Sequence, residues 1–125
     1  MGIIEKMRLD GKKAFVTGGA QGIGRRIATA LAEAGADVAI VDVNLEAAQK
    51  TAREIQEANR NHMIAVKADI TNPEDVNRMI ETILEEFGRL DAAFCNAGIG
   101  HNVEVENDTL EDWSRVINVN LNGTF

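Results

Sequence analysis

Four glycines lie within seven residues of one another, between an apolar run and a segment with helical periodicity. Glycine clusters occur where the backbone adopts angles that a Cβ forbids, or where it closely approaches another molecule. At the start of a helix, free backbone N–H groups and the helix dipole favour an anion. The cluster therefore predicts a turn that binds a pyrophosphate. Its members are Gly18, Gly19, Gly22 and Gly24.

The spacing gives three of these glycines different tasks. The pattern is Thr-Gly-x-x-x-Gly-x-Gly with Gly19 extra, which is looser than the standard G-x-G-x-x-G fingerprint. We expect Gly18 to make the turn, Gly22 to let the backbone approach the ligand, and Gly24 to let helix and sheet pack closely. Taken alone, the cluster also fits a glycine turn without a ligand.

An acidic residue further along the chain favours a dinucleotide as that ligand. Asp42 ends the second expected strand, 18 residues after Gly24, where dinucleotide-binding folds place an acid for the adenosine ribose. Its carboxylate would repel a 2′-phosphate, and Gln21 in the glycine loop offers no cation to one. We therefore expect NAD rather than NADP. Taken alone, Asp42 would better fit a helix-capping or solvated acid.

The elements that position these residues follow from short apolar runs alternating with longer helical segments. Such alternation is typical of βαβ units in a parallel sheet. The sequence predicts an α/β fold, a Rossmann-like doubly wound parallel sheet, of which residues 1–125 form a half-domain with the first four strands and flanking helices only. Strands are expected at 12–17, 36–43, 62–70 and 90–98, and helices at 22–34, 45–59, 71–88 and 108–125.

Cap residues mark the ends of the expected helices. Asn44 and Asn72 are good N-caps, and Gly35 and Gly88 stand where a left-handed residue would end a helix. Thr109 begins the last helix at a capping spacing from an aspartate three residues later.

Apolar spacing predicts the first of these helices. Ile23, Ile27, Ala30, Leu31 and Ala34 recur three and four residues apart, as in an amphipathic helix. Cys95, the single cysteine, ends an apolar strand and is expected to be a small buried hydrophobe rather than a reactive thiol.

Composition excludes several classes of partner. The net charge of −7 and pI of about 4.8 argue against nucleic acid or an anionic membrane surface, which bind basic patches. No apolar run approaches the roughly 18 residues of a membrane helix. One cysteine and no secretory leader favour the reducing cytoplasm. No ligand spacing surrounds His62 or His101, so no metal site is predicted.

Over nearly its whole length, the chain resembles the short-chain dehydrogenase/reductase family. "TGGAQGIG" resembles the family's cofactor loop, "VDVN" and "ADIT" its adenosine-binding strand ends, "CNAG" its Asn-Asn-Ala-Gly motif, and "INVNLNG" the helix bearing its catalytic-site asparagine. Cys95 departs from the motif's first asparagine. The resemblance implies NAD as cofactor, with binding by Gly18, Gln21, Gly22, Ile23, Gly24, Asp42, Asp69, Ile70, Asn96, Ala97 and Gly98.

The resemblance also implies roles for individual residues. Asp69 would approach the adenine amino group, Ile70 would pack on the ring, and residues 96–98 would lie along the ribose side of the cofactor. Asn120 falls on the catalytic-site asparagine, which holds a water in the proton relay.

The implied reaction is the interconversion of a secondary alcohol and a ketone by hydride transfer, with a sugar, polyol or hydroxysteroid all open as substrate. The family's Tyr-x-x-x-Lys lies beyond this segment, and the chain contains no tyrosine, so we expect the 125 residues alone to be inactive. Two alternatives remain. One is a noncatalytic dinucleotide-binding module or sensor, and the other is a methyltransferase, against which "CNAG" and "INVNLNG" speak.

The fourth expected strand predicts how the chain assembles. It is apolar on both faces, yet nothing after it can form a parallel neighbour, so its edge is open. We expect this chain to be a fragment of a longer dehydrogenase. The full-length protein is expected to be a homodimer or homotetramer, whose subunits contact one another through Trp113, Val116 and Leu121.

Overall fold

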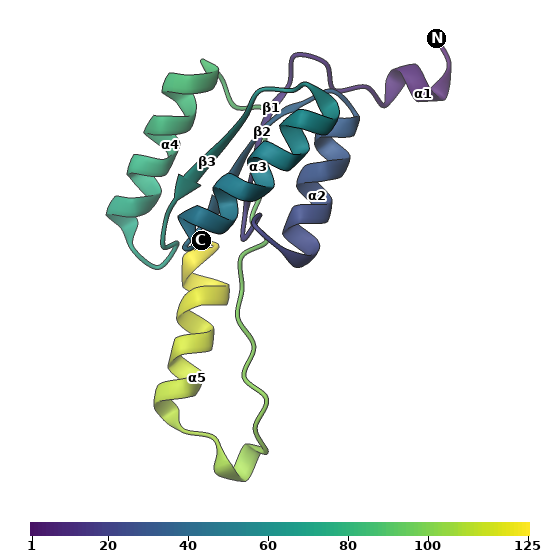
Figure 1. Cartoon of the computed structure of the whole chain (residues 1–125). Helices are drawn as coiled ribbons and strands as arrows, with labels where there is room; N and C mark the ends of the chain where they lie inside the picture. Colours follow the sequence, from purple (N-terminus) through teal and green to yellow (C-terminus); the bar gives the residue numbers. More distant parts are fainter.

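The structure is a computed structural model that describes all 125 residues. Its core is a sheet of four parallel strands in the order β3-β2-β1-β4 (Figure 1). The predicted α/β, Rossmann-like arrangement is confirmed, and the strand order places β4 at an open edge beside β1. The strands are β1 (Lys13–Thr17), β2 (Asp37–Asp42), β3 (Met63–Lys67) and β4 (Ala92–Phe94).

Helices cover both faces of the sheet. On one face, α2 and α3 pack against inward side chains of β1 and β2 that include Val16, Val38 and Ile40. On the other face, α4 packs Met79, Ile83 and Phe87 against the opposite side chains of the same strands. The helices are α1 (Ile3–Lys6), α2 (Gly22–Glu33), α3 (Leu45–Asn59), α4 (Pro73–Phe87) and α5 (Leu110–Ile117), with 3-10 helix η1 (Val105–Asn107) and π-helix η2 (Asn118–Gly123).

The predicted caps hold the helices at the expected residues. The Asn44 side chain accepts a hydrogen bond from the N–H of Ala47 at 3.0 Å, and the Asn72 side chain accepts one from Glu74 at 2.9 Å. Gly88 ends α4 with a left-handed φ of 75°. Each asparagine satisfies backbone donors that the first turn of a helix leaves free.

The residues that α2 buries are not the bulky apolar ones whose spacing predicted the helix. Gly24, Ala28 and Ala32 face the sheet, whereas Ile23 is 74% exposed. Small side chains at every fourth residue let the helix approach the strands closely, so the bulkier Ile27 is displaced to the flank of the contact. Apolar spacing therefore predicted the helix but not which residues face the sheet, because apolarity alone does not show how close two elements come.

The third and fourth strands are shorter than predicted. Strand β3 ends at Lys67, opposite Asp42, the last residue of its neighbour β2, so residues 68–70 lie in the following loop. Strand β4 pairs on one side only, and only over three residues. Because no strand covers that edge, Cys95 is exposed, which corrects the expectation of a buried thiol.

The segment after β4 extends away from the sheet. A long loop leaves the sheet and α5 returns beside it, so that the C-terminus lies near the carboxyl ends of the strands (Figure 1). The last predicted helix is α-helical only to Ile117 and then widens into η2. No residue after Phe87 is buried in this chain.

Candidate cofactor site

A cleft of about 790 Å³ opens at the carboxyl ends of all four strands. In a parallel sheet, this edge collects the loops that follow each strand and is the usual place for a ligand. The volume lies within the range of small-molecule pockets. Ten of the predicted residues line the cleft: Gly18, Gln21, Gly22, Ile23, Asp42, Asp69, Ile70, Asn96, Ala97 and Gly98.

The glycine turn joins β1 to α2 with three distinct backbone requirements. Gly18 has a φ of 62°, and a Cβ there would lie 2.9 Å from the Cα of Ala97. Gly22 has a φ of 59°, but a Cβ there would meet nothing within 4 Å, so its backbone borders open space at the start of α2. A Cβ at Gly24 would lie 2.1 Å from the carbonyl oxygen of Gly18. Gly24 therefore lets the start of α2 pack against the backbone of Gly18, and it does not line the cleft.

Gly19, which the pattern left without a task, is also constrained. A Cβ there would lie 2.8 Å from the carbonyl oxygen of Val16 and 3.2 Å from Cγ2 of Ile40. The turn thus folds directly onto β1 and β2, and only glycine fits. The spacing pattern does not reveal this requirement, because it arises from the neighbouring strand.

Two backbone groups hold the carboxylate of Asp42 beside the glycine turn. Its Oδ2 accepts a hydrogen bond from the N–H of Ala20 at 3.2 Å, and its Oδ1 accepts one from Asn44 at 3.1 Å. The acid is therefore fixed at the end of β2, at the wall of the cleft. Gln21 lies in the same wall, so no cation balances the acid at this end.

The loop after β3 supplies a second acid. Asp69 Oδ1 accepts hydrogen bonds from the N–H and the hydroxyl of Thr71, at 2.9 and 2.7 Å. The Asp69 N–H donates to Asp75 Oδ2 at 2.9 Å, and this bond, helped by Arg78, lowers the pKa of Asp75. The first turn of α4 thereby fixes the loop that carries Asp69 and Ile70.

Thr17 connects the glycine turn to the loop after β4. Its hydroxyl accepts hydrogen bonds from the N–H groups of Asn96 and Ala97, both at 3.1 Å. In return, the Asn96 side chain donates to the carbonyl oxygens of Thr17 and Gly18 at 3.1 and 3.4 Å. Thr17 was not among the predicted site residues, although it is the threonine that begins the Thr-Gly-x-x-x-Gly-x-Gly pattern.

Asn120 lies behind the cleft rather than in its lining. Its Oδ1 accepts from the N–H of Ile99 at 2.8 Å and its Nδ2 donates to the carbonyl oxygen of Ile99 at 2.9 Å. The side-chain amide therefore fastens η2 to the loop after β4. Its neighbours Asn118 and Val119 line the cleft instead, and neither was predicted.

The charge lining the cleft is nearly balanced. Besides Asp42 and Asp69, one charged side chain, Arg115 of α5, lines it. Arg115 Nη2 also donates to Asp112 Oδ1 at 3.3 Å. With few fixed cations, the wall relies on backbone N–H groups at the start of α2 to attract an anion.

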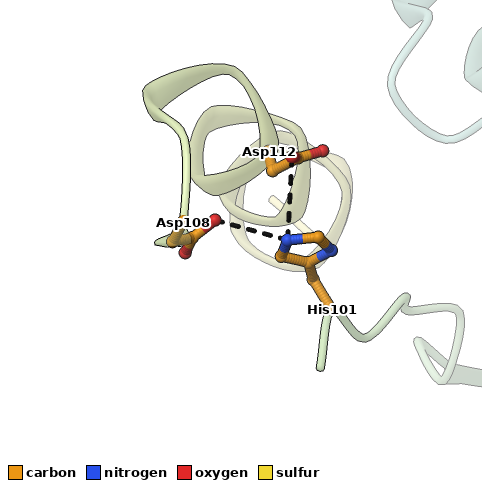
Figure 2. Close-up of side chains that lie close together, drawn as sticks. All are labelled: His101, Asp108 and Asp112. Atoms are coloured by element: carbon orange, nitrogen blue, oxygen red, sulfur yellow. Dashed lines mark ion pairs between the residues drawn. The ribbon is translucent and has the colours of Figure 1, made fainter. Parts of the chain in front are cut away.

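A second group of chemically capable side chains lies outside the cleft. His101 Nε2 is 3.3 Å from Asp108 Oδ1 and 3.6 Å from Asp112 Oδ2 (Figure 2). The sequence around His101 shows no ligand spacing, because its partners reach it only when the loop and η1 fold back. This group, His101, Asp108 and Asp112, is called the His101 cluster below.

The comparisons with known proteins agree with this geometry. A profile described as short chain dehydrogenase matches residues 12–125. The chain belongs to the short-chain dehydrogenase family. It is 43% identical over 119 residues to cyclohexanol dehydrogenase of Acinetobacter sp. (strain SE19), covering 94% of this chain and 47% of that protein.

Solved structures of short-chain dehydrogenases superpose closely on the chain. A short-chain type dehydrogenase/reductase from Mycobacterium marinum has a TM-score of 0.95 at 35% identity, covering 100% of this chain and 50% of that one. An NAD⁺-bound xylitol dehydrogenase has a TM-score of 0.88 at 32% identity, covering 93% of this chain and 45% of that one. The chain thus spans about half the length of the relatives it matches.

No helix in the structure combines the length and apolar composition needed to cross a membrane.

Proposed function

We propose that this chain is the cofactor-binding half of an NAD-dependent oxidoreductase that interconverts a secondary alcohol and a ketone. The observation that carries the proposal is the carboxylate of Asp42, which two backbone N–H groups hold at the wall of the cleft beside the glycine turn. Carboxylates in this place bind the adenosine ribose hydroxyls of NAD.

The relatives support an alcohol or ketone as substrate. Cyclohexanol dehydrogenase and xylitol dehydrogenase are both named for alcohols, one cyclic and one a polyol. Because these two alcohols differ, we propose only the substrate class for this protein, a small alcohol or ketone. The xylitol enzyme was solved with NAD⁺, which agrees in cofactor type with the cleft described above.

The preference for NAD over NADP rests on charge. A 2′-phosphate at the adenosine ribose would approach Asp42, and Gln21 in the same wall provides no compensating cation. Arg115 lies in the lining contributed by α5, where it pairs with Asp112. Like-charge contacts of this kind cost several kcal/mol when desolvated.

The predicted site residues have distinct tasks in this proposal. The backbone at Gly22, with the start of α2, binds the pyrophosphate, while Asp69 and Ile70 contact the adenine. Residues 96–98 lie along the ribose next to the nicotinamide, the group that accepts or supplies hydride. Asn120 keeps the task that the resemblance implies, holding a water of the proton relay, while its side-chain amide bonds to Ile99.

We propose further that the protein works in the cytoplasm as a homodimer or homotetramer. Leu110, Trp113 and Leu121 on α5 and η2 are 80%, 60% and 63% exposed, and packing against a second copy would cover them. Val116, the other residue predicted for this contact, is half-buried within its own chain.

A second candidate function is a noncatalytic dinucleotide-binding module. The 125 residues contain no tyrosine, so they lack the phenol that would exchange a proton with the substrate. Both candidates predict NAD binding. They differ in turnover, and a Tyr-x-x-x-Lys sequence downstream in the coding sequence would favour the first.

Titration with NADH and NADPH, followed by cofactor fluorescence, tests the proposal. We expect tighter binding of NADH, and expect Asp42→Ala to weaken it by about 1–3 kcal/mol while narrowing the preference. Glu57→Ala is the matched control, because Glu57 is an exposed acid near the end of α3 and does not line the cleft. Equal or tighter binding of NADPH by the unmodified protein would contradict the proposal.

A further inference from the structure

The His101 cluster joins three side chains of metal-binding type from two parts of the protruding segment. His101 lies in the loop after β4, Asp108 directly after η1, and Asp112 in the first turn of α5. One ligand atom from each lies within 4.8 Å of the others. Figure 2 shows the imidazole nitrogen facing the space between the two carboxylates, so one imidazole nitrogen and two oxygens converge.

Two of the three distances between these atoms match those expected around one metal ion. Around a tetrahedral ion with bonds of about 2.0–2.1 Å, neighbouring ligand atoms are separated by about 3.3–3.4 Å. The two nitrogen-to-oxygen distances of 3.3 and 3.6 Å are close to this separation. Both distances are longer than the roughly 2.7–2.9 Å of a charge-assisted hydrogen bond.

Thr109 orients both carboxylates toward the histidine. Its N–H donates to Asp108 Oδ1 at 2.8 Å, and its hydroxyl donates to Asp112 Oδ2 at 2.9 Å. Hydrogen bonds of this kind typically orient metal-binding carboxylates.

Charge also favours a cation at this place. Two carboxylates face one imidazole, and the only other cation in contact, Arg115, donates to Oδ1 of Asp112 and leaves Oδ2 directed at His101. The mixed set of one nitrogen and two oxygens suits zinc and its first-row neighbours better than Ca²⁺ or Mg²⁺, which prefer oxygen alone.

We propose that His101, Asp108 and Asp112 bind a divalent transition-metal ion, with Zn²⁺ as the preferred ion. Three protein ligands leave a fourth position for water or another group. The ion fastens the loop after β4 to the first turn of α5, one turn before Arg115 of the cofactor cleft. This site is distinct from the cleft, because none of the three ligands lines it.

Titration of the metal-free, tag-free chain with Co²⁺ tests this site directly. We expect visible d–d absorption of four-coordinate cobalt, one ion per chain, that Zn²⁺ abolishes by displacement. His101→Ala and Asp108→Asn should each weaken Co²⁺ binding by at least about tenfold. His62→Ala is the matched control, since the other histidine of the chain has a single carboxylate, Glu86, at 3.9 Å.

Far-UV circular dichroism of each variant keeps the test decisive. If His101→Ala disturbs the fold, His101→Gln replaces it, and the same loss of cobalt binding is expected with native helix content. Absence of d–d bands would overturn the proposal, as would binding that survives both His101 variants or disappears in His62→Ala. NADH binding is measured separately, so failure of the metal site leaves the proposed function untouched.

Discussion

The two parts of the chain before and after Phe87 are built differently. All buried residues lie between Ala14 and Phe87, and none lies in residues 88–125. In β2, four consecutive side chains from Val38 to Val41 are buried, because helices cover both faces of the strand. In β4, no side chain is buried, although the strand is equally apolar. The difference shows that burial depends on neighbours rather than on the apolar character of a strand.

Both parts nevertheless contribute to the cleft. Residues 14–87, called the body here, supply the glycine turn and the two acids, while the segment 88–125 supplies Asn96 to Ile99 and residues of α5 and η2. Polar contacts join the two parts near the site, chiefly those of Thr17 with Asn96 and Ala97. The site therefore spans a stable body and a segment held largely by hydrogen bonds.

The largest expected effect is on the stability of the body. Ile40 is fully buried between α2 and α3, so Ile40→Ala should lower the free energy of unfolding by about 2–5 kcal/mol. Trp113→Ala, at a side chain 60% exposed on α5, should change it by less than about 0.5 kcal/mol. Urea unfolding followed by circular dichroism measures both. Equal losses would show that α5 is part of the same cooperative core.

A second substitution breaks the junction between the two parts. Gly18→Val introduces a β-branched side chain at a φ of 62° and against the Cα of Ala97, so it should displace the loop after β4. We expect NADH affinity to fall at least about a hundredfold, equivalent to about 2.7 kcal/mol, while helix content stays native.

Gly11→Val is the control for Gly18→Val. Gly11 has a φ of 75° with nothing within 4 Å of a Cβ, so this variant has the backbone strain without the clash and lies away from the cleft. Comparable loss of NADH binding in the two variants would mean that strain, rather than the contact with Ala97, causes the effect.

A smaller effect on stability is expected when acid protonates Asp37. Burial disfavours the charge on Asp37, but hydrogen bonds from the Lys13 ammonium and the His62 N–H, with the attraction of Lys13, lower the pKa of Asp37 overall. A carboxyl whose pKa is lowered by folding stabilises the protein above its unfolded pKa of about 3.9, and this stabilisation is lost as pH falls through the folded value.

Asp37→Asn should therefore remove about 1–2 kcal/mol at pH 7 and flatten the fall in stability between about pH 5 and pH 3. Asp112→Asn lies in the exposed segment and should leave unfolding of the body unchanged. Urea midpoints measured at several pH values check both variants. If stability falls with pH as steeply in Asp37→Asn as in the unmodified protein, the bond to Lys13 does not stabilise the fold.

The sequence predicts the body well because its signals are local. Asn44, Asn72 and Gly88 mark helix ends through the hydrogen bonds and angles of a single turn, and each was predicted. The exposed position of Ile23 and the need for glycine at position 19 depend on how closely α2 and the turn approach the sheet. Spacing along one element does not contain that distance.

The candidate site was predictable to a similar degree. The strand-end residues Asp42 and Asp69 were identified from spacing and from the resemblance to the family, and the structure brings both to one cleft. Thr17 and Arg115 were missed because their place in the site depends on partners far away in sequence. The His101 cluster was missed for the same reason, since it forms only when the loop folds back on α5.

The most direct test of this account is hydrogen exchange of the chain with and without saturating NADH. The account predicts that NADH slows exchange together in the glycine turn at 18–24, at the end of β2 around Asp42, and in the loop at 96–98, with little change in α4. Protection confined to one of these regions, or centred elsewhere, would contradict a dinucleotide site built jointly by the body and the segment that follows it.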